Sequence, residues 1–319
     1  MFKKAASFQI LLLLLTAFLS QTKNSQSQTV HFGGERSKGV LYIRDVNSNK
    51  QWEKFREAKD DVNLPTGKEW GLEVAEDASK DLSWLIVLKG DNLKLLALSG
   101  KDVNDSKMHC AAELTSVESL WLQNCSVSDS GLTQIKNLKL LKQLVLFNTN
   151  VTDEGLVVLR EMPLLTNLNC HNLKAGKAGL SHLKQLKGLK SLSVTRADIK
   201  DADLEYLSNM VQLEQLDLSF TSITDDGLAN LAVLTMLRYL SLWGNRLSDN
   251  GLGWLTTLKN LETLQISGDF TDEGLKYLEN LSSLKTLSIT GRAITQGGID
   301  RLKTKTKIQN INFTSVSPK

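Results

Sequence analysis

Cys170 and His171 are neighbours in the chain and could in principle form a thiol–imidazole nucleophile. Both fall in a predicted strand, where successive side chains point to opposite faces, so the imidazole would not reach the thiol. No second metal ligand is predicted beside His171. The motifs G-x-S-x-G, H-E-x-x-H and the P-loop are absent from the sequence. We therefore predict that the chain is not an enzyme, binds no metal and needs no cofactor.

A second chemically interesting group is a Ser or Thr that is usually followed by Asp, because such pairs could supply oxygen ligands to calcium. No dense cluster of carboxylates accompanies them. Ser and Thr are also favoured N-cap residues, and Asp is favoured in the first helical turn. We predict capping rather than calcium binding, with the following glycine allowing tight packing of the turn. The residues concerned are Ser128, Thr152, Thr224, Ser248, Thr271 and Thr295.

These residues are placed by a repeat that fills most of the chain and explains why 59 of the 319 residues are leucine. The pattern L-x-x-L-x-L recurs with its middle position at 96, 120, 144, 168, 192, 216, 240, 264, 287 and 311. Every step is 24 residues except one of 23. Within each unit the apolar period changes from two to three or four, which predicts a strand followed by a helix. One unit cannot fold alone, so the units must stack.

The second half of the unit is clearest at residues 221–228, which read TSITDDGL, and it recurs at 151–156, 247–252 and 270–275. Over residues 93–319 the chain resembles the leucine-rich repeat family, in its T-x-I-T-D-x-G-L variant. That variant occurs in bacterial exported proteins and, with slightly longer units, in substrate receptors of F-box ubiquitin ligases. The resemblance implies an α/β solenoid with about ten parallel strands on a concave face and short helices on a convex face.

Most outward positions of the predicted concave strands are small and polar, so aromatic residues stand out there. Exposed aromatics on a polar face commonly anchor an interface. The alternative is that some of them pack against neighbours or against the N-terminal region. The candidate binding residues are Trp121, Phe147, His171, Phe220, Tyr239 and Trp243.

The chain has three cysteines, so at least one is unpaired. Cys125 follows a predicted strand at a turn position whose side chain points inward, and Cys170 occupies a leucine position. Both are expected to be buried. Their units are not adjacent, which argues against a bridge between them. Cys110 is predicted on a convex helix, and its pairing with Cys125 stays open.

Residues 28–92 break the pattern, and we predict an N-terminal cap there. Residues 40–43 indicate a strand, and residues 51–58 indicate a short amphipathic helix. Leu72 and Val74 lie 24 residues before Leu96 and Leu98, so residues 69–92 are expected to form a degenerate repeat. An open solenoid needs such an atypical terminal unit to cover its first apolar face.

Residues 1–27 have the order of a secretory signal peptide. Lys3 and Lys4 precede an apolar run of about twelve residues, which is too short to span a bilayer, and a polar stretch follows. Cleavage is expected after Ser27, with Ser20 as the alternative. The segment carries three lysines and no acid, so its removal takes the net charge from +3 to zero. No stable membrane span would then remain.

Near-neutral charge argues against nucleic-acid binding driven by bulk charge. We therefore expect a non-catalytic exported scaffold, periplasmic, cell-surface or extracellular, that binds a protein, peptide or glycan on its concave face. Two alternatives stay open. One is an intracellular adaptor of the ubiquitin-ligase substrate-receptor type, and the other is a structural spacer without a ligand. An enzyme site within residues 28–92 would have only His31 and several carboxylates to use.

Overall fold

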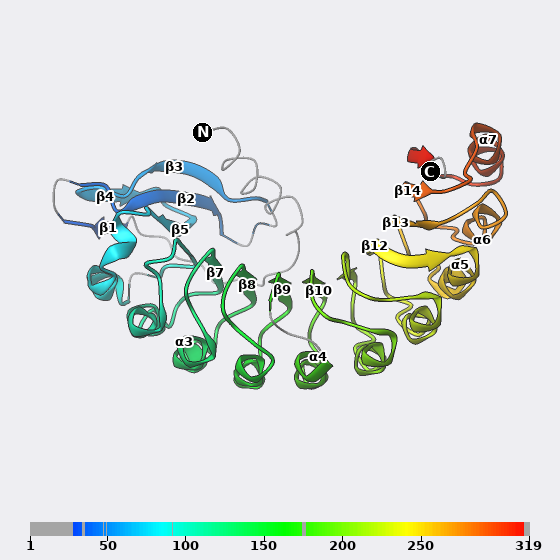
Figure 1. Cartoon of the computed structure of the whole chain (residues 1–319). Helices are drawn as coiled ribbons and strands as arrows, with labels where there is room; N and C mark the ends of the chain where they lie inside the picture. Colours follow the sequence, from blue (N-terminus) through cyan, green and yellow to red (C-terminus); the bar gives the residue numbers. More distant parts are fainter. Residues whose placement is uncertain are drawn as a thin grey trace.

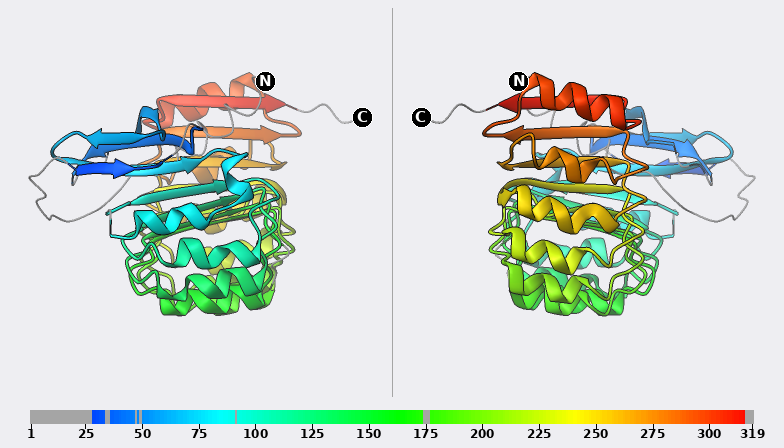
Figure 2. Two further views of the ribbon diagram at one scale, coloured as in Figure 1. Left: turned by 90° about the vertical axis from the view of Figure 1, so that its left-hand side faces the viewer. Right: turned by 90° about the vertical axis from the view of Figure 1, so that its right-hand side faces the viewer.

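The structure, a computed structural model, describes residues 28–33, 36–46, 48, 50–90, 92–173 and 177–315. The predicted signal peptide lies outside the described residues. The chain forms a curved solenoid with strands along its inner side and helices along its outer side (Figure 1). In side view the helices of successive coils stack along the solenoid (Figure 2). Here a coil means one repeat unit of 23 or 24 residues.

Within the described residues, ten strands pair side by side in parallel, as the repeat predicts. The register follows the leucines: Leu96 is opposite Leu120, and Leu120 is opposite Leu144. The strands are β6 (Leu95–Ser99), β7 (Ser119–Gln123), β8 (Gln143–Phe147), β9 (Asn167–His171), β10 (Ser191–Thr195), β11 (Gln215–Asp217), β12 (Tyr239–Ser248), β13 (Thr263–Asp269), β14 (Thr286–Gly291) and β15 (Asn310–Ser315).

The outer side carries short α-helices and 3₁₀-helices, since little chain is left in each coil once the strand and turns are made. Their apolar faces and the inward strand leucines form one continuous core. The elements are η3 (Asp105–Lys107), α2 (Met108–Ala112), α3 (Asp129–Gln134), η4 (Ile135–Asn137), η5 (Glu154–Glu161), α4 (Lys177–Leu183), η6 (Asp201–Leu207), η7 (Asp225–Leu231), α5 (Asp249–Trp254), η8 (Leu255–Thr257), α6 (Leu275–Leu278) and α7 (Gln296–Lys305).

Successive coils are also joined by hydrogen bonds to aspartate, which we call the aspartate ladder. In each contact, the aspartate of one coil accepts from the backbone N–H of a Ser or Thr of the next coil at 2.7–2.9 Å. The hydroxyl of the same Ser or Thr donates to the second carboxylate oxygen. The pairs are Asp105–Ser128, Asp129–Thr152, Asp201–Thr224, Asp225–Ser248, Asp249–Thr271 and Asp272–Thr295.

The ladder corrects the capping prediction. Ser128, Thr224 and Ser248 occupy N-cap positions but make no capping hydrogen bond with their side chains. Thr295 does cap, because its hydroxyl oxygen accepts from the Gly298 N–H. Asp153 and Gly274 take the N-cap position in the coils of Thr152 and Thr271. Donation to the aspartate does not itself prevent capping, because the Thr295 hydroxyl donates to Asp272 and also accepts from Gly298. The Thr271 hydroxyl likewise donates to Asp249 and accepts from the Glu273 N–H.

The N-terminal region contains β1 (Gln28–His31), β2 (Gly39–Asp45), β3 (Glu53–Glu57), β4 (Asp61–Leu64), β5 (Lys68–Val74), η1 (Ala78–Lys80) and η2 (Ser83–Leu88). The strand predicted at residues 40–43 lies within β2. β5 runs parallel to β6 with Leu72 opposite Leu96, which confirms the predicted register of the degenerate repeat. β5 pairs on its other side with β2, which is antiparallel to it.

The helix predicted over residues 51–58 is wrong, because most of this segment forms β3. It pairs antiparallel with β2, so the hydrogen bonds of the β2 edge decide its conformation against its helix-like pattern. Phe55, in the middle of β3, packs against the main core. Trp52, just before β3, packs on a separate apolar cluster that lies on the concave face.

Candidate binding groove on the concave face

The six candidate binding residues lie on or beside β7, β8, β9, β11 and β12, but the structure does not bring them into one patch. Trp121 is only 2% exposed. It packs with Ala97, Val145 and Trp52, and its indole N–H donates to the Ser119 hydroxyl at 2.9 Å. The expectation that Trp121 is an exposed aromatic is therefore wrong. Packing against a neighbouring coil and the N-terminal region accounts for it.

Phe147 and His171 form a stacked pair on adjacent strands. Their ring centroids are 4.3 Å apart and the rings are nearly parallel, at 5°. The His171 Nδ1 atom lies 2.7 Å from the Thr195 hydroxyl, so its neighbours are those that the repeat predicts. Burial lowers the pKa of His171, and the nearby Arg196 lowers it further. Near neutral pH the imidazole is therefore mostly uncharged. It forms a half-buried aromatic surface with a polar edge.

Phe220 lies two coils beyond His171, and Tyr239 and Trp243 lie three coils beyond it. Phe220 follows β11 in a left-handed turn with φ 56°, and its ring is 45% exposed. The Arg196 guanidinium lies 4.6 Å from the Phe220 ring centroid. Glycine suits position 244, because a Cβ atom there would sit 2.5 Å from the Phe220 ring. Tyr239 and Trp243 are both half-buried in β12.

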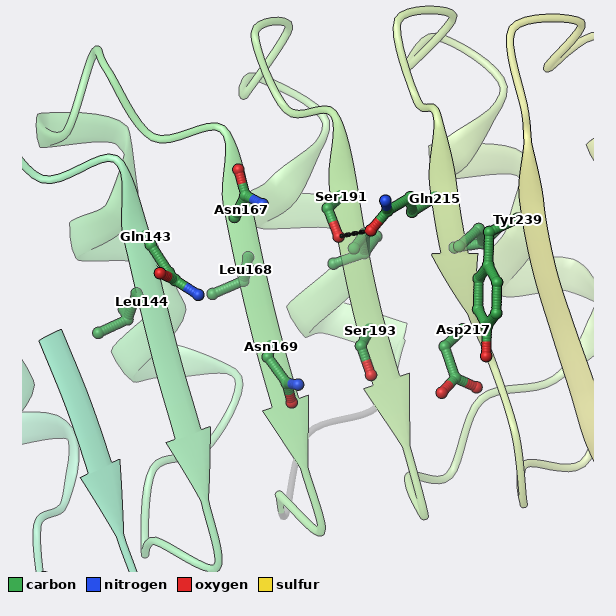
Figure 3. Close-up of a pocket in the computed structure, with 12 residues that line it drawn as sticks. Gln143, Leu144, Asn167, Leu168, Asn169, Ser191, Ser193, Gln215, Asp217 and Tyr239 are labelled. Carbon is green, nitrogen blue, oxygen red and sulfur yellow. Dashed lines mark hydrogen bonds between the residues drawn. The ribbon is translucent and has the colours of Figure 1, made fainter. Parts of the chain in front are cut away.

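A groove crosses β8 to β12, and of the six candidate binding residues Tyr239 lines it (Figure 3). Its lining consists mainly of polar side chains from the concave side of consecutive strands. One row comprises Asn169, Ser193 and Asp217, which are directly opposite one another in the sheet register. A second row contributes Gln143, Asn167, Ser191, Gln215 and Tyr239, and in it Ser191 donates to the Gln215 amide oxygen at 3.1 Å.

Asp217 is the charged residue that lines this groove. Its Oδ1 atom accepts from the backbone N–H of Ser219 at 2.9 Å and from the Ser219 hydroxyl at 2.5 Å. Burial raises the pKa of Asp217, and the hydrogen bonds from Ser219 and Ser241 only partly oppose it. Among the described residues, no ion pair reaches this carboxylate. Burial and the Asp217 charge raise the pKa of Tyr239 to about 12.

Two side-chain atoms that line the groove are buried without a hydrogen-bond partner, namely the Asn169 Oδ1 atom and the Gln143 Nε2 atom. Buried polar atoms are usually paired, so each such atom needs an explanation. Sequence reasoning selected aromatic positions and overlooked the row that contains Gln143. The signal was available, because positions two residues apart on a strand share a face.

The cysteines offer no activated nucleophile. Cys110, Cys125 and Cys170 are all buried and free, so the pairing left open between Cys110 and Cys125 is not formed. Burial raises the pKa of Cys125 and of Cys170 to about 12. Sequence reasoning missed the contact between the Cys110 thiol and His109 Nε2, at 3.3 Å, but burial raises the pKa of Cys110 too.

The described residues also bear on metal binding and on membrane insertion. The described residues contain no group of three or more His, Cys, Asp or Glu that could hold a metal ion. They also contain no helix of the length and hydropathy needed to cross a membrane.

Comparison with known proteins gives one family match and several structural similarities. Residues 212–232 match the family model described as Leucine Rich repeat. No curated protein matches the chain. Internalin C2 from Listeria monocytogenes is 21% identical over 73% of this chain and 84% of its own, with a TM-score of 0.43. A leucine-rich repeat protein of Leptospira interrogans is 21% identical over 73% of this chain and 68% of its own, with a TM-score of 0.47.

The matched segment is one coil of a series, and the same register runs through all ten parallel strands of the described residues. Its inward leucines, its turn and its outer helix recur at the same spacing on either side. This chain therefore has the fold of a leucine-rich repeat solenoid.

Proposed function

We propose that this protein is a non-catalytic, exported interaction scaffold that binds a protein or peptide in the groove of its concave face. The observation that carries the proposal is the groove itself, with Asn169 and Gln143 atoms buried but unpaired and with the aromatic side chain of Tyr239 in its lining. Both atoms are buried, so a ligand would pair with them after their side chains turn toward the groove. Residues 28–92 would serve as the cap of the first coil.

The binding experiment has two components. One is the protein in the form that the source cells produce, and the other is the mixture of proteins that these cells export. The immobilised chain is incubated with this fraction, and retained proteins are identified by mass spectrometry. Affinity for each retained protein is then measured with Trp243→Ser. The matched control is Trp254→Ser, since Trp254 is 49% exposed but lies at the end of α5 on the convex side.

We expect Trp243→Ser to weaken binding by about tenfold or more, as for an aromatic contact on the concave face, and Trp254→Ser to leave it unchanged. Equal affinities for both variants and the unchanged chain would contradict a concave site. If no protein or peptide is retained at all, the spacer alternative is favoured.

Export is tested separately, through the mature N-terminus. We expect mass spectrometry of the cell's own product to find it at Gln28, or at Gln21 if cleavage follows Ser20. A full-length cytosolic product that keeps residues 1–27 would instead favour the intracellular adaptor.

A further inference from the structure

The row that contains Asp217 has an open position at its centre. Asn169, Ser193 and Asp217 are directly opposite one another on β9, β10 and β11. Neighbouring strands lie about 4.8 Å apart, so the backbones of Asn169 and Asp217 are separated by about 10 Å. Only the small side chain of Ser193 stands between them, and Tyr239 lies beside Asp217 at the other end (Figure 3).

The two ends of this row are an amide, Asn169, and a carboxylate, Asp217. The Asn169 Oδ1 atom is buried and unpaired. The Asp217 carboxylate receives hydrogen bonds from neighbouring serine groups but forms no ion pair with any described residue. A carboxylate withdrawn from water without a cation is costly to the fold, so another residue would serve stability better at this position.

The chemistry of the row selects the group that would fill it. An anion would be repelled by Asp217, and an apolar group would leave the buried carboxylate without a counter-charge. One carboxylate and one amide oxygen are too few ligands for a bound metal ion, which takes six or more oxygens in the case of calcium. A cationic side chain supplies both the charge and several N–H donors, and the Tyr239 ring offers an aromatic surface beside it.

We propose that the gap between Asn169 and Asp217 is a subsite for the cationic side chain of an arginine or lysine in the partner. This inference deepens the proposed function and rests on it for the source of that side chain. The subsite itself is a property of three adjacent strands and can be tested with small molecules.

The probes are N-acetyl-arginine amide and N-acetyl-lysine amide, with N-acetyl-citrulline amide as the uncharged analogue of arginine. Binding to the full chain is measured by ligand-observed NMR titration. The test variant is Asp217→Asn, whose amide oxygen can still accept the hydrogen bonds from Ser219. The control variant is Asp226→Asn, which removes an exposed carboxylate of η7 on the convex side. Circular dichroism checks that both variants are folded.

We expect saturable binding of at least one cationic probe, no saturable binding of the citrulline probe, and affinity at least about tenfold lower in Asp217→Asn. Asp226→Asn should bind as the unchanged chain does. Equal binding of the arginine and citrulline probes, absence of binding by both cationic probes, or unchanged affinity in Asp217→Asn would overturn the proposal.

The two proposals can fail independently. If the cationic probes bind through Asp217 but no protein or peptide partner is retained, the subsite stands and the proposed function fails. If a partner is retained and its affinity is indifferent to Asp217→Asn, the concave-face function stands and the subsite fails.

Discussion

Two glycines in α5 test whether the aspartate ladder determines the glycine pattern of the repeat. At Gly251 an added Cβ atom would sit 2.3 Å from the Oδ1 atom of Asp225, which belongs to the preceding coil. At Gly253 the nearest atom to an added Cβ would be a Tyr277 ring carbon at 3.6 Å, an ordinary contact. Neither glycine has a positive φ, so the two positions differ mainly in what surrounds them.

The expected effects of alanine therefore have opposite signs. In Gly251→Ala the carboxylate must move and loses its hydrogen bonds from the backbone N–H and the hydroxyl of Ser248. Two hydrogen bonds to a charged group contribute about 3 kcal/mol or more, while alanine gains about 1 kcal/mol of helix propensity. We expect Gly251→Ala to lower the free energy of unfolding by about 2 kcal/mol or more, and Gly253→Ala to raise it by up to about 1 kcal/mol.

The assay is urea unfolding followed by circular dichroism at equal protein concentration. Asp225→Ser supplies the second test, because it removes the atom that blocks the new Cβ. In the Asp225→Ser background, Gly251→Ala should cost at least about 1 kcal/mol less than it does in the unchanged chain. The reasoning is refuted if Gly251→Ala and Gly253→Ala shift the unfolding midpoint equally, or if Asp225→Ser leaves the cost of Gly251→Ala unaltered.

Three further predictions concern the concave face and the core. Because burial raises the pKa of Asp217 in the folded state, its ionisation costs stability as pH rises through that pKa. Asp217→Asn should therefore unfold at a higher temperature than the unchanged chain near neutral pH, and the difference should shrink toward pH 4. Tyr239, the titratable side chain beside Asp217 in the groove, stays neutral in this range. Trp121→Ala should lower the free energy of unfolding by about 3–5 kcal/mol in urea unfolding, and a change under about 1 kcal/mol would contradict its burial. Cys125 and Cys170, whose pKa values burial raises to about 12, should resist a thiol reagent at pH 8 until urea is added.

The strand register could be predicted from sequence because it depends on one local rule repeated many times. Leu96, Leu120 and Leu144 each occupy the same inward position, so an error in one coil is corrected by its neighbours. The helix expected over residues 51–58 had no such support. Its pattern was interpreted alone. Its conformation depends on pairing with the edge of β2, and the local sequence pattern contains no information about that contact.

The contents of the candidate site were harder to predict, for two physical reasons. Trp121 occupies a position that is outward in the repeat, and only the packing of Trp52 from outside the repeat makes it buried. The hydroxyl of Ser128 donates to Asp105, an aspartate one coil away, and this contact depends on how the coils stack. The sequence of a single coil contains neither the Trp52 side chain that covers Trp121 nor the Asp105 carboxylate that binds Ser128.

The contrast between two aspartates supports a ligand role for Asp217. Asp105 and Asp217 are both partly buried, and both accept hydrogen bonds from serine. In each case burial raises the pKa, but for Asp105 the hydrogen bonds from Ser128, Ser130 and the Gly131 backbone outweigh it and leave the pKa low. For Asp217 burial prevails. The ladder thus shows how this repeat satisfies a carboxylate that serves the fold. Asp217 lacks that arrangement, and the missing stabilisation is what a cation from a partner could supply.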